Sequence, residues 1–241
     1  MTLKKFATVD DLVAFAAQEI VAQVAHALAA HGRVNLALSG GSTPAPLYRR
    51  LAALALPWAQ THVYWADERC VPPDDDGSNY KLARETLLDH VPIPPENVHR
   101  VRGELSPEAA AQDYVKQLRE SAEHGRAFPR LTAAILGMGS DGHTASLFPG
   151  SPVDITEPAA AVTADYDGRP AKRVTLTPAV LNESELVLFL VTGASKAGAL
   201  TAVLEGPHLP QKWPAQRIQA KHGRVLWLAD QAAASQLTIN D

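Results

Sequence analysis

A glycine-rich segment, residues 137–144, carries the side chains best suited to proton transfer. It has the sequence Gly-Met-Gly-Ser-Asp-Gly-His-Thr and follows the apolar residues 131–136, which predict a buried strand. Asp141 and His143 lie two residues apart, and a histidine supported by an aspartate is a common general base near neutral pH. Glycines let a backbone take positive φ or pass close to a ligand. We therefore expect proton transfer in a catalysed reaction at this turn.

A second polar turn has the composition of an anion site. It follows the predicted strand 34–38 and leads into Pro44, a good first helical residue. Backbone N–H groups, hydroxyls and a helix N-terminus can together bind a phosphate, although a turn capped by Thr43 without any ligand fits equally well. The GxxxxGK[ST] spacing of a P-loop is absent. The candidate phosphate-binding residues are Ser39, Gly40, Gly41, Ser42 and Thr43.

Two cations follow other predicted strands. Arg69 ends the triplet Asp67-Glu68-Arg69 after the strand 62–66, where it could bind a phosphate, polarise a carbonyl, or simply pair with neighbouring acids. Lys196 lies near a helix N-terminus, where the helix dipole disfavours a cation unless an anion offsets it. A solvated surface lysine is the alternative.

Composition excludes several classes of function. The formal net charge of −4 provides no global basic field for nucleic acid or an anionic membrane. The single cysteine, Cys70, fits a reducing compartment, and no signal peptide or membrane-length apolar run is evident, so we expect a cytoplasmic protein. The nine histidines show no HExxH or CxxC-type pattern, so we expect no metal site.

Predicted strands and helices alternate along the chain. Apolar residues at three- and four-residue steps predict a helix over 10–30, and further strands are expected at 98–101, 159–163, 173–176, 186–191 and 225–228. This alternation predicts an α/β fold with a doubly wound, mainly parallel sheet and helices on both faces, in a single domain over residues 1–241. Ligands bind such sheets beyond the carboxyl ends of the strands. Four polar turns that follow predicted strands should therefore share one rim: residues 39–43, 67–69, 137–143 and 192–196.

Residues 137–142 also match G-x-G-x-x-G, the fingerprint of a dinucleotide site. That motif needs a long helix directly after it and an acid about 20 residues further on. The Leu-Phe-Pro-Gly-Ser-Pro sequence of residues 147–152 breaks any helix, and Asp141 would place a negative charge beside the pyrophosphate. The pattern therefore disfavours a dinucleotide.

With these residues in view, the sequence resembles the 6-phosphogluconolactonase family. The similarity includes residues 38–44 (LSGGSTP), 65–72 (WADERCVP), 137–149 (GMGSDGHTASLFP) and 192–196 (TGASK), in family order. It implies the fold shared with glucosamine-6-phosphate deaminases, whose motifs resemble DEY and GHIAFNEP. Here Arg69 replaces the tyrosine, and no glutamate stands between His143 and Pro149. Both differences favour lactone hydrolysis over deamination.

The resemblance implies a sugar-phosphate lactone as substrate and suggests a role for each candidate. His143 would be the general base, oriented by Asp141 or Asp67, while Arg69 would stabilise the tetrahedral intermediate or bind phosphate. Residues 39–43 and Lys196 would hold the phosphate, with Arg173 as a weaker candidate. No metal or organic cofactor is required, and we expect a monomer, with a weak homodimer as the alternative. A non-catalytic sugar-phosphate binding module remains a second reading.

Overall fold

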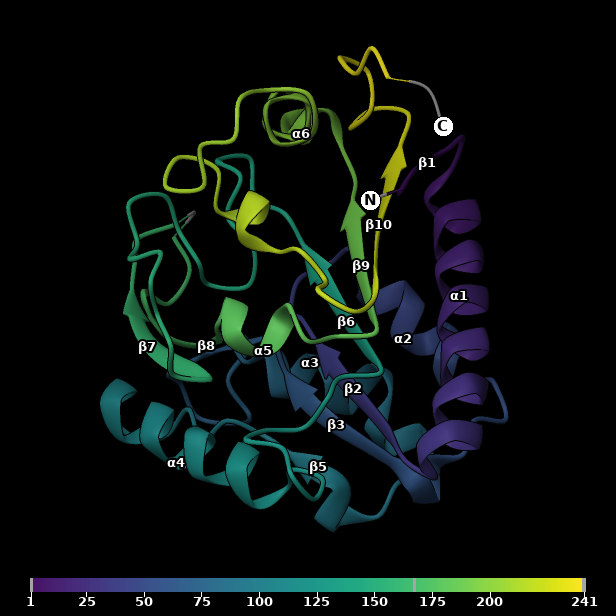
Figure 1. Ribbon diagram of the computed structural model, residues 1–241, viewed down its shortest axis with the longest axis vertical. Coiled ribbons are helices and arrows are strands. Elements are labelled where there is room, and N and C mark those ends of the chain that lie inside the picture. The colour runs from purple at the N-terminus through teal and green to yellow at the C-terminus, as the bar shows by residue number, and fades with distance from the viewer. Residues whose placement is uncertain (1, 167, 240–241) are drawn as a thin grey trace.

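A seven-stranded parallel sheet forms the centre of the computed structural model, which describes residues 2–166 and 168–239 (Figure 1). The strand order is β1-β10-β9-β6-β2-β3-β5, and every neighbouring pair runs parallel. Its strands are β1 (Thr2–Phe6), β2 (Val34–Leu38), β3 (Thr61–Trp65), β5 (Val98–His99), β6 (Ala133–Gly137), β9 (Leu186–Val191) and β10 (Arg224–Asp230). From β2 the chain winds outward through β3 to β5, and from β6 it winds the other way through β9 to β10, with β1 at that edge, which confirms the doubly wound prediction.

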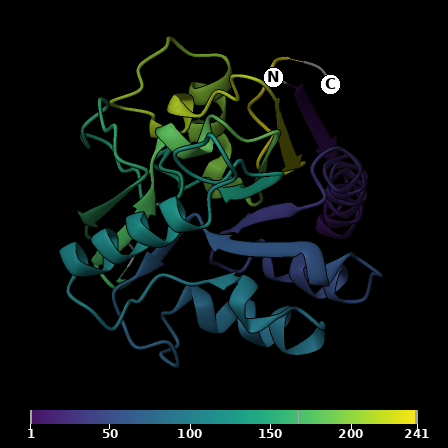
Figure 2. The ribbon, with the colours of Figure 1, turned by 60° about the horizontal axis from the view of Figure 1, so that its bottom comes forward.

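Helices lie above and below these strands (Figure 2). The α-helices are α1 (Val9–His31), α2 (Ala45–Ala52), α3 (Asn79–Thr86), α4 (Pro107–Glu120), α5 (Pro178–Leu181) and α6 (Ala197–Leu204). Short 3₁₀ turns occupy Trp58–Gln60, Leu88–His90, Pro95–Asn97, Ala194–Lys196 and Pro214–Arg217. Because β9 is buried along its whole length, its unbroken apolar sequence is explained by helices on both faces.

Serine and threonine caps begin several of these helices. Thr8, Ser78 and Ser106 accept hydrogen bonds from the backbone N–H groups three residues on, at the starts of α1, α3 and α4. The predicted cap at Thr43 is wrong. Pro44 is the cap residue of α2 and makes no side-chain bond, while the Thr43 hydroxyl lies 3.1 Å from that of Thr192. The prediction relied on residue type alone, whereas the Thr43 hydroxyl hydrogen-bonds Thr192, which follows β9.

A second, three-stranded antiparallel sheet was not predicted. It consists of β4 (Asp67–Arg69), β8 (Lys172–Leu176) and β7 (Ala159–Thr163), in the order β4-β8-β7. Ala66 separates β3 from β4, donating its N–H to Leu38 O in one sheet and accepting from Leu176 N–H in the other. The second sheet therefore begins at the carboxyl end of β3 and forms one side of the rim.

The first helix, α1, is long and apolar enough by composition to cross a membrane, with a mean hydropathy of 1.5. In this fold its apolar residues pack against the central sheet and α2. Leu12, Ala16 and Ile20 are fully buried, and α1 packs on β1, β2, β10 and α2. The hydropathy of this helix is thus accounted for by one face that packs against the sheet.

A stacked histidine pair at the sheet edge predicts a pH-dependent stability. His62 Nδ1 and His99 Nε2 lie 2.9 Å apart, and the pKa of each falls to about 4, chiefly through burial and then through neighbouring charge. Because the unfolded value is 6.5, the free energy of unfolding should decrease as pH falls below 6.5, with the loss continuing down to about 4. Urea midpoints at pH 7 and pH 5 should show a larger loss for the wild type than for His99→Gln. Equal losses would contradict this prediction.

Candidate active site

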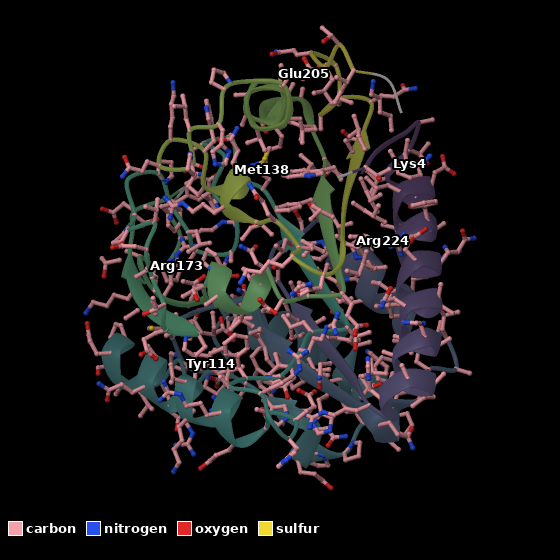
Figure 3. All side chains as sticks on the ribbon, in the orientation of Figure 1. Lys4, Tyr114, Met138, Arg173, Glu205 and Arg224 are labelled. Atoms are coloured by element: carbon pink, nitrogen blue, oxygen red, sulfur yellow. The ribbon has the colours of Figure 1, made fainter. Side chains whose placement is uncertain are left out.

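The four predicted polar turns meet around one cavity of about 260 Å³ at the carboxyl ends of the central strands. Its walls come from both sheets; Figure 3 labels Met138, just past β6, and Arg173 of β8. The expectation of a shared rim is therefore confirmed. The predicted residues that line the cavity are Ser39, Gly40, Gly41, Ser42, Thr43, Asp67, Arg69, His143, Arg173 and Lys196.

Two buried tyrosines fix the ends of the strands that lead into this rim. The Tyr48 hydroxyl accepts from Ser39 N–H at 2.8 Å and donates to Ser39 O at 2.6 Å. Likewise, the Tyr114 hydroxyl bonds the N–H and the carbonyl of Trp65, both at 2.9 Å. Burial raises the pKa of both phenols well above the usual value, so they stay neutral and can donate and accept together. Each phenol satisfies backbone groups where a strand ends.

His143 and Asp141 form a tight pair at the cavity wall. His143 Nδ1 lies 2.6 Å from Asp141 Oδ1, and the His143 backbone N–H donates to the same oxygen at 3.1 Å. Burial alone would raise the pKa of the Asp141 carboxyl, but these bonds and the charge of His143 outweigh it and lower the pKa. Asp141 is therefore a carboxylate that can accept from Nδ1–H, and in the neutral imidazole this bond places the unprotonated nitrogen at Nε2.

The backbone conformation around His143 and Asp141 requires glycine at positions 139 and 142. A side chain at Gly139 would collide with the His143 ring, so the turn can close only over a glycine. Gly142 has φ 77°, and a Cβ there would lie 2.6 Å from Trp213. Ala145, which also lines the cavity, takes φ 48°, at a cost of about 1–2 kcal/mol for a non-glycine residue. Strain of this size at a cavity wall is typical of a functional site.

Asp67 does not orient His143. Its Oδ2 accepts from the Ser146 hydroxyl at 2.7 Å, and its Oδ1 lies 3.3 Å from the Asn79 amide. Of the two carboxylates considered from the sequence, Asp141 is the one that bonds the imidazole. Asp67 instead joins β4 to the start of α3 and to the turn that carries His143.

Glu68 is buried behind the cavity and organises the same junction. Its carboxyl accepts from the backbone N–H groups of Arg69, Asn79 and Tyr80 at 2.6–2.7 Å. Burial raises its pKa to about 7, although the backbone bonds act in the opposite direction. Glu68 thus holds the beginning of α3 against β4. The DER triplet was expected to place all three charges at the rim, but only Asp67 and Arg69 line the cavity.

Arg69 and Arg173 form a like-charged pair across β4 and β8. They are register partners in the antiparallel ladder, and both are buried, with 9% and 2% exposure. Burial is the main reason that the pKa of Arg173 falls, and the charge of Arg69 adds to it. Arg69 Nε and Arg173 Nη2 have no acceptor within residues 2–166 and 168–239. Opposed like charges destabilise a sheet, so this wall is suited to an anion between them.

The phosphate candidates lie together, but not all of their donors are available. Ser39 N–H is already bonded to Tyr48, whereas the buried Ser39 hydroxyl has no partner in the part of the chain that the structure describes. Lys196 ends the 3₁₀ turn before α6 and lines the cavity, and it forms no salt bridge with any described residue. The alternative considered for Arg69, an ion pair with Asp67, Glu68 or the acids of residues 74–76, is likewise absent among the described side chains. Arg69 Nη1 donates to Gly77 O instead.

Two cavity residues, Tyr166 and Arg169, were missed by sequence reasoning. They lie in the connection between β7 and β8, which was predicted only as a polar turn. Tyr166 packs edge-on against His143, with ring centroids 4.5 Å apart. No local pattern could place this turn over the cavity, because its position depends on β8 pairing with β4. Arg169 adds a further cation to a wall that already holds Arg69 and Arg173.

The dinucleotide alternative does not fit the structure. After β6 the chain forms turns, and the next helix is the short α5, beyond β7 and β8. Among residues 2–166 and 168–239, no cluster of three His, Cys, Asp or Glu side chains could hold a metal ion. The described residues offer the cavity an imidazole paired with the Asp141 carboxylate, the Asp67 carboxylate, three guanidiniums, an ammonium and hydroxyls.

Comparison with known proteins agrees with this geometry. A family described as glucosamine-6-phosphate isomerases/6-phosphogluconolactonase matches residues 7–227. A 6-phosphogluconolactonase from Synechocystis sp. is 41% identical over 221 residues, which cover 90% of each chain. The crystal structure of a 6-phosphogluconolactonase from Thermotoga maritima has a TM-score of 0.84 at 32% identity, covering 95% of this chain and 99% of the other.

A monomeric glucosamine-6-phosphate deaminase has the same fold, with a TM-score of 0.85 at 23% identity and coverage of 98% of this chain and 100% of its own. The fold is therefore common to both activities. The family match spans nearly the whole chain, and the lactonase relatives share a third or more of its residues. This chain belongs to the glucosamine-6-phosphate isomerase/6-phosphogluconolactonase family.

Proposed function

We propose that this protein hydrolyses 6-phospho-D-glucono-1,5-lactone to 6-phosphogluconate, the lactone step of the oxidative pentose phosphate pathway. The observation that carries the proposal is the His143–Asp141 pair at the wall of a cavity lined by Arg69, Arg169, Arg173 and Lys196. A base beside a strongly cationic cavity suits an ester bond in a phosphorylated substrate. A non-catalytic sugar-phosphate module would need the cations but not the oriented imidazole.

His143 would act first as general base and then as general acid. With Nδ1–H held by Asp141, Nε2 removes a proton from a water molecule as the water oxygen attacks the lactone carbonyl carbon. The tetrahedral intermediate then collapses, the bond from carbon to ring oxygen breaks, and the imidazolium returns its proton to that oxygen. The products are a carboxylic acid, which ionises, and a hydroxyl, so the histidine ends in its starting state.

Arg69 would stabilise the negative oxygen of the tetrahedral intermediate, with phosphate binding as its alternative role. Its guanidinium donates from Nη1 to Gly77 O, and Arg69 is the register partner of the like-charged Arg173 across the strands. An anion placed there relieves the repulsion between the two arginines. A donor held in place before the reaction stabilises a developing charge without the cost of reorganisation.

The 6-phosphate would bind residues 39–43 and Lys196, with Arg173 in support. Lys196→Ala should therefore raise KM for the phosphorylated lactone roughly 10- to 100-fold, since a charge-assisted hydrogen bond contributes about 1.5–3 kcal/mol. The same variant should leave hydrolysis of unphosphorylated gluconolactone nearly unchanged. Steady-state kinetics on both lactones check the prediction. Equal losses on the two substrates would show that Lys196 does not contact the phosphate.

A deaminase is the competing activity within the same fold. The segment from His143 to Pro149 lacks the glutamate that the deaminase motif carries, which supports hydrolysis. The test is a pH-stat measurement of acid release from freshly prepared 6-phosphogluconolactone, corrected for spontaneous hydrolysis. An ammonia assay with glucosamine 6-phosphate runs beside it. Ammonia production without acid release would overturn the proposal.

The proposal treats residues 1–241 as one catalytic domain that works in the cytoplasm as a monomer, without metal or cofactor. The family match over residues 7–227 supports a single unit, because it spans both sheets. Sedimentation equilibrium over a range of protein concentrations tests the monomer against a weak homodimer. Activity that persists after exhaustive treatment with EDTA would agree with a metal-free mechanism.

A further inference from the structure

The connection between β7 and β8 projects two side chains over the cavity. The two strands pair from Ala159 with Leu176 to Thr163 with Lys172, and the ladder continues through Ala164 N–H to Ala171 O at 3.0 Å. Beyond it, Tyr166 and Arg169 form an isolated antiparallel bridge. Because residues opposite each other in such a bridge share a face, Tyr166 and Arg169 point to the same side, and both line the cavity.

The His143 imidazole contacts two aromatic rings that also pack on each other, with centroids 5.9 Å apart. Phe148 packs on His143 with centroids 4.5 Å apart and the planes inclined by 32°. Tyr166 packs edge-on at 4.5 Å and 78°, and only 13% of the His143 side chain is exposed. Phe148 comes from the turn that carries His143, and Arg173 lies over its ring at 5.2 Å. Tyr166 makes its contact from the β7–β8 connection.

Each neighbour restricts a different motion of the imidazole. The Asp141 bond fixes Nδ1, but rotation about that bond would still move Nε2 across the cavity. The two rings pack on adjoining sides of the imidazole and on each other, and together they block this rotation. The Tyr166 hydroxyl lies 3.4 Å from both the N–H and the hydroxyl of Ser140, which is a weak contact at most. The ring is therefore the part of Tyr166 that acts on His143.

We propose that Tyr166 is a positioning residue, whose ring holds the His143 imidazole in the rotamer that presents Nε2 to the lactone. The inference rests on the proposed hydrolysis and deepens it. It gives the second sheet a catalytic purpose, because the pairing of β8 with β4 determines where Tyr166 lies. Tyr166 need not touch the reacting atoms for this role.

Kinetics on three variants test the proposal. Tyr166→Ala should lower kcat about tenfold with KM within about twofold, because a small misplacement of the reacting nitrogen slows chemistry more than binding. Tyr166→Phe keeps the ring and should retain kcat within about twofold of wild type. Thr163→Ala, an exposed position on the same hairpin, is the matched control and should behave as wild type. A Phe variant as slow as the Ala variant would overturn the proposal.

A spectroscopic measurement makes the test independent of activity. Long-range ¹H–¹⁵N spectra of the His143 ring, assigned by difference from His143→Ala, should show the Nδ1–H tautomer in wild type and Tyr166→Phe. Tyr166→Ala should keep this tautomer, because Asp141 still accepts from Nδ1–H, but its ring signals should broaden as the imidazole samples other rotamers, at an unchanged melting temperature. Ring signals as narrow in Tyr166→Ala as in wild type would overturn the proposal. If wild type hydrolyses no lactone while these spectra hold, the proposed function fails and the positioning role stands.

Discussion

Replacing His143 by alanine should lower kcat for 6-phosphogluconolactone by about 10²- to 10⁴-fold, the usual contribution of a general base. The reason is the geometry of the pair. Asp141 holds Nδ1, so Nε2 is the nitrogen available to activate water, and no other histidine lines the cavity among the described residues. KM should change little, since the phosphate is assigned to residues 39–43 and Lys196. Spontaneous hydrolysis must be subtracted, because it sets the floor of the measurement.

Two controls separate catalysis from folding. His143 packs on Phe148 and Tyr166, so alanine removes contacts as well as a base, and His143→Gln keeps more of this volume. Both variants should bind 6-phosphogluconate with near-wild-type affinity by calorimetry. If either variant keeps kcat within about threefold of wild type, His143 has no part in the chemistry.

The central sheet and its order of elements could be predicted from local sequence because each element carries its own signal. An unbroken apolar run indicates a strand buried on both faces, as residues 186–191 show, and a three- and four-residue repeat indicates α1. The rule that ligands bind at the carboxyl ends of parallel strands then brought the four polar turns together. The rim around residues 39–43, Asp67, His143 and Lys196 follows from strand positions alone.

The second sheet could not be predicted in this way. β4 has three residues and a charged sequence, and it becomes a strand only because β8 pairs with it across a long separation in the chain. The same pairing sets Arg69 opposite Arg173 and carries Tyr166 to His143. Similarly, the sequence left Asp67 and Asp141 as equal candidates for orienting the imidazole. Hydrogen-bond geometry, which depends on tertiary packing, decides for Asp141.

The paired arginines illustrate how a binding site departs from the rules that stabilise a fold. Two buried arginines are register partners across β4 and β8, and each has an N–H without an acceptor in the described ranges, 2–166 and 168–239. Such an arrangement lowers the stability of the free protein. It is consistent with a site whose missing partner is an anionic ligand, since the ligand then gains the interactions that the fold leaves unmade.

Asp141→Asn should lower kcat by about 10²- to 10⁴-fold, nearly as much as the loss of His143 itself, if the carboxylate sets the tautomer. In wild type, one carboxylate oxygen of Asp141 accepts from both the backbone N–H and Nδ1 of His143. An asparagine has one oxygen and one NH₂ group, so nothing forces its oxygen to face Nδ1. Its amide can instead donate to Nδ1, which moves the ring proton to Nε2 and removes the base from the cavity. A neutral asparagine also fails to stabilise the imidazolium that forms when water is deprotonated.

Asp67→Asn is the matched comparison, because it removes the other carboxylate at the same cavity. Asp67 accepts from the Ser146 hydroxyl and the Asn79 amide, so its loss should lower the melting temperature and raise KM, while the tautomer of His143 stays as in wild type. The two variants are therefore compared by kcat on the lactone and by the ¹⁵N spectrum of His143. A tautomer that changes in Asp67→Asn but not in Asp141→Asn would reverse the assignment. An Asp141→Asn enzyme with wild-type kcat would show that the imidazole needs no carboxylate, and water activation would then depend on the two rings and the backbone alone.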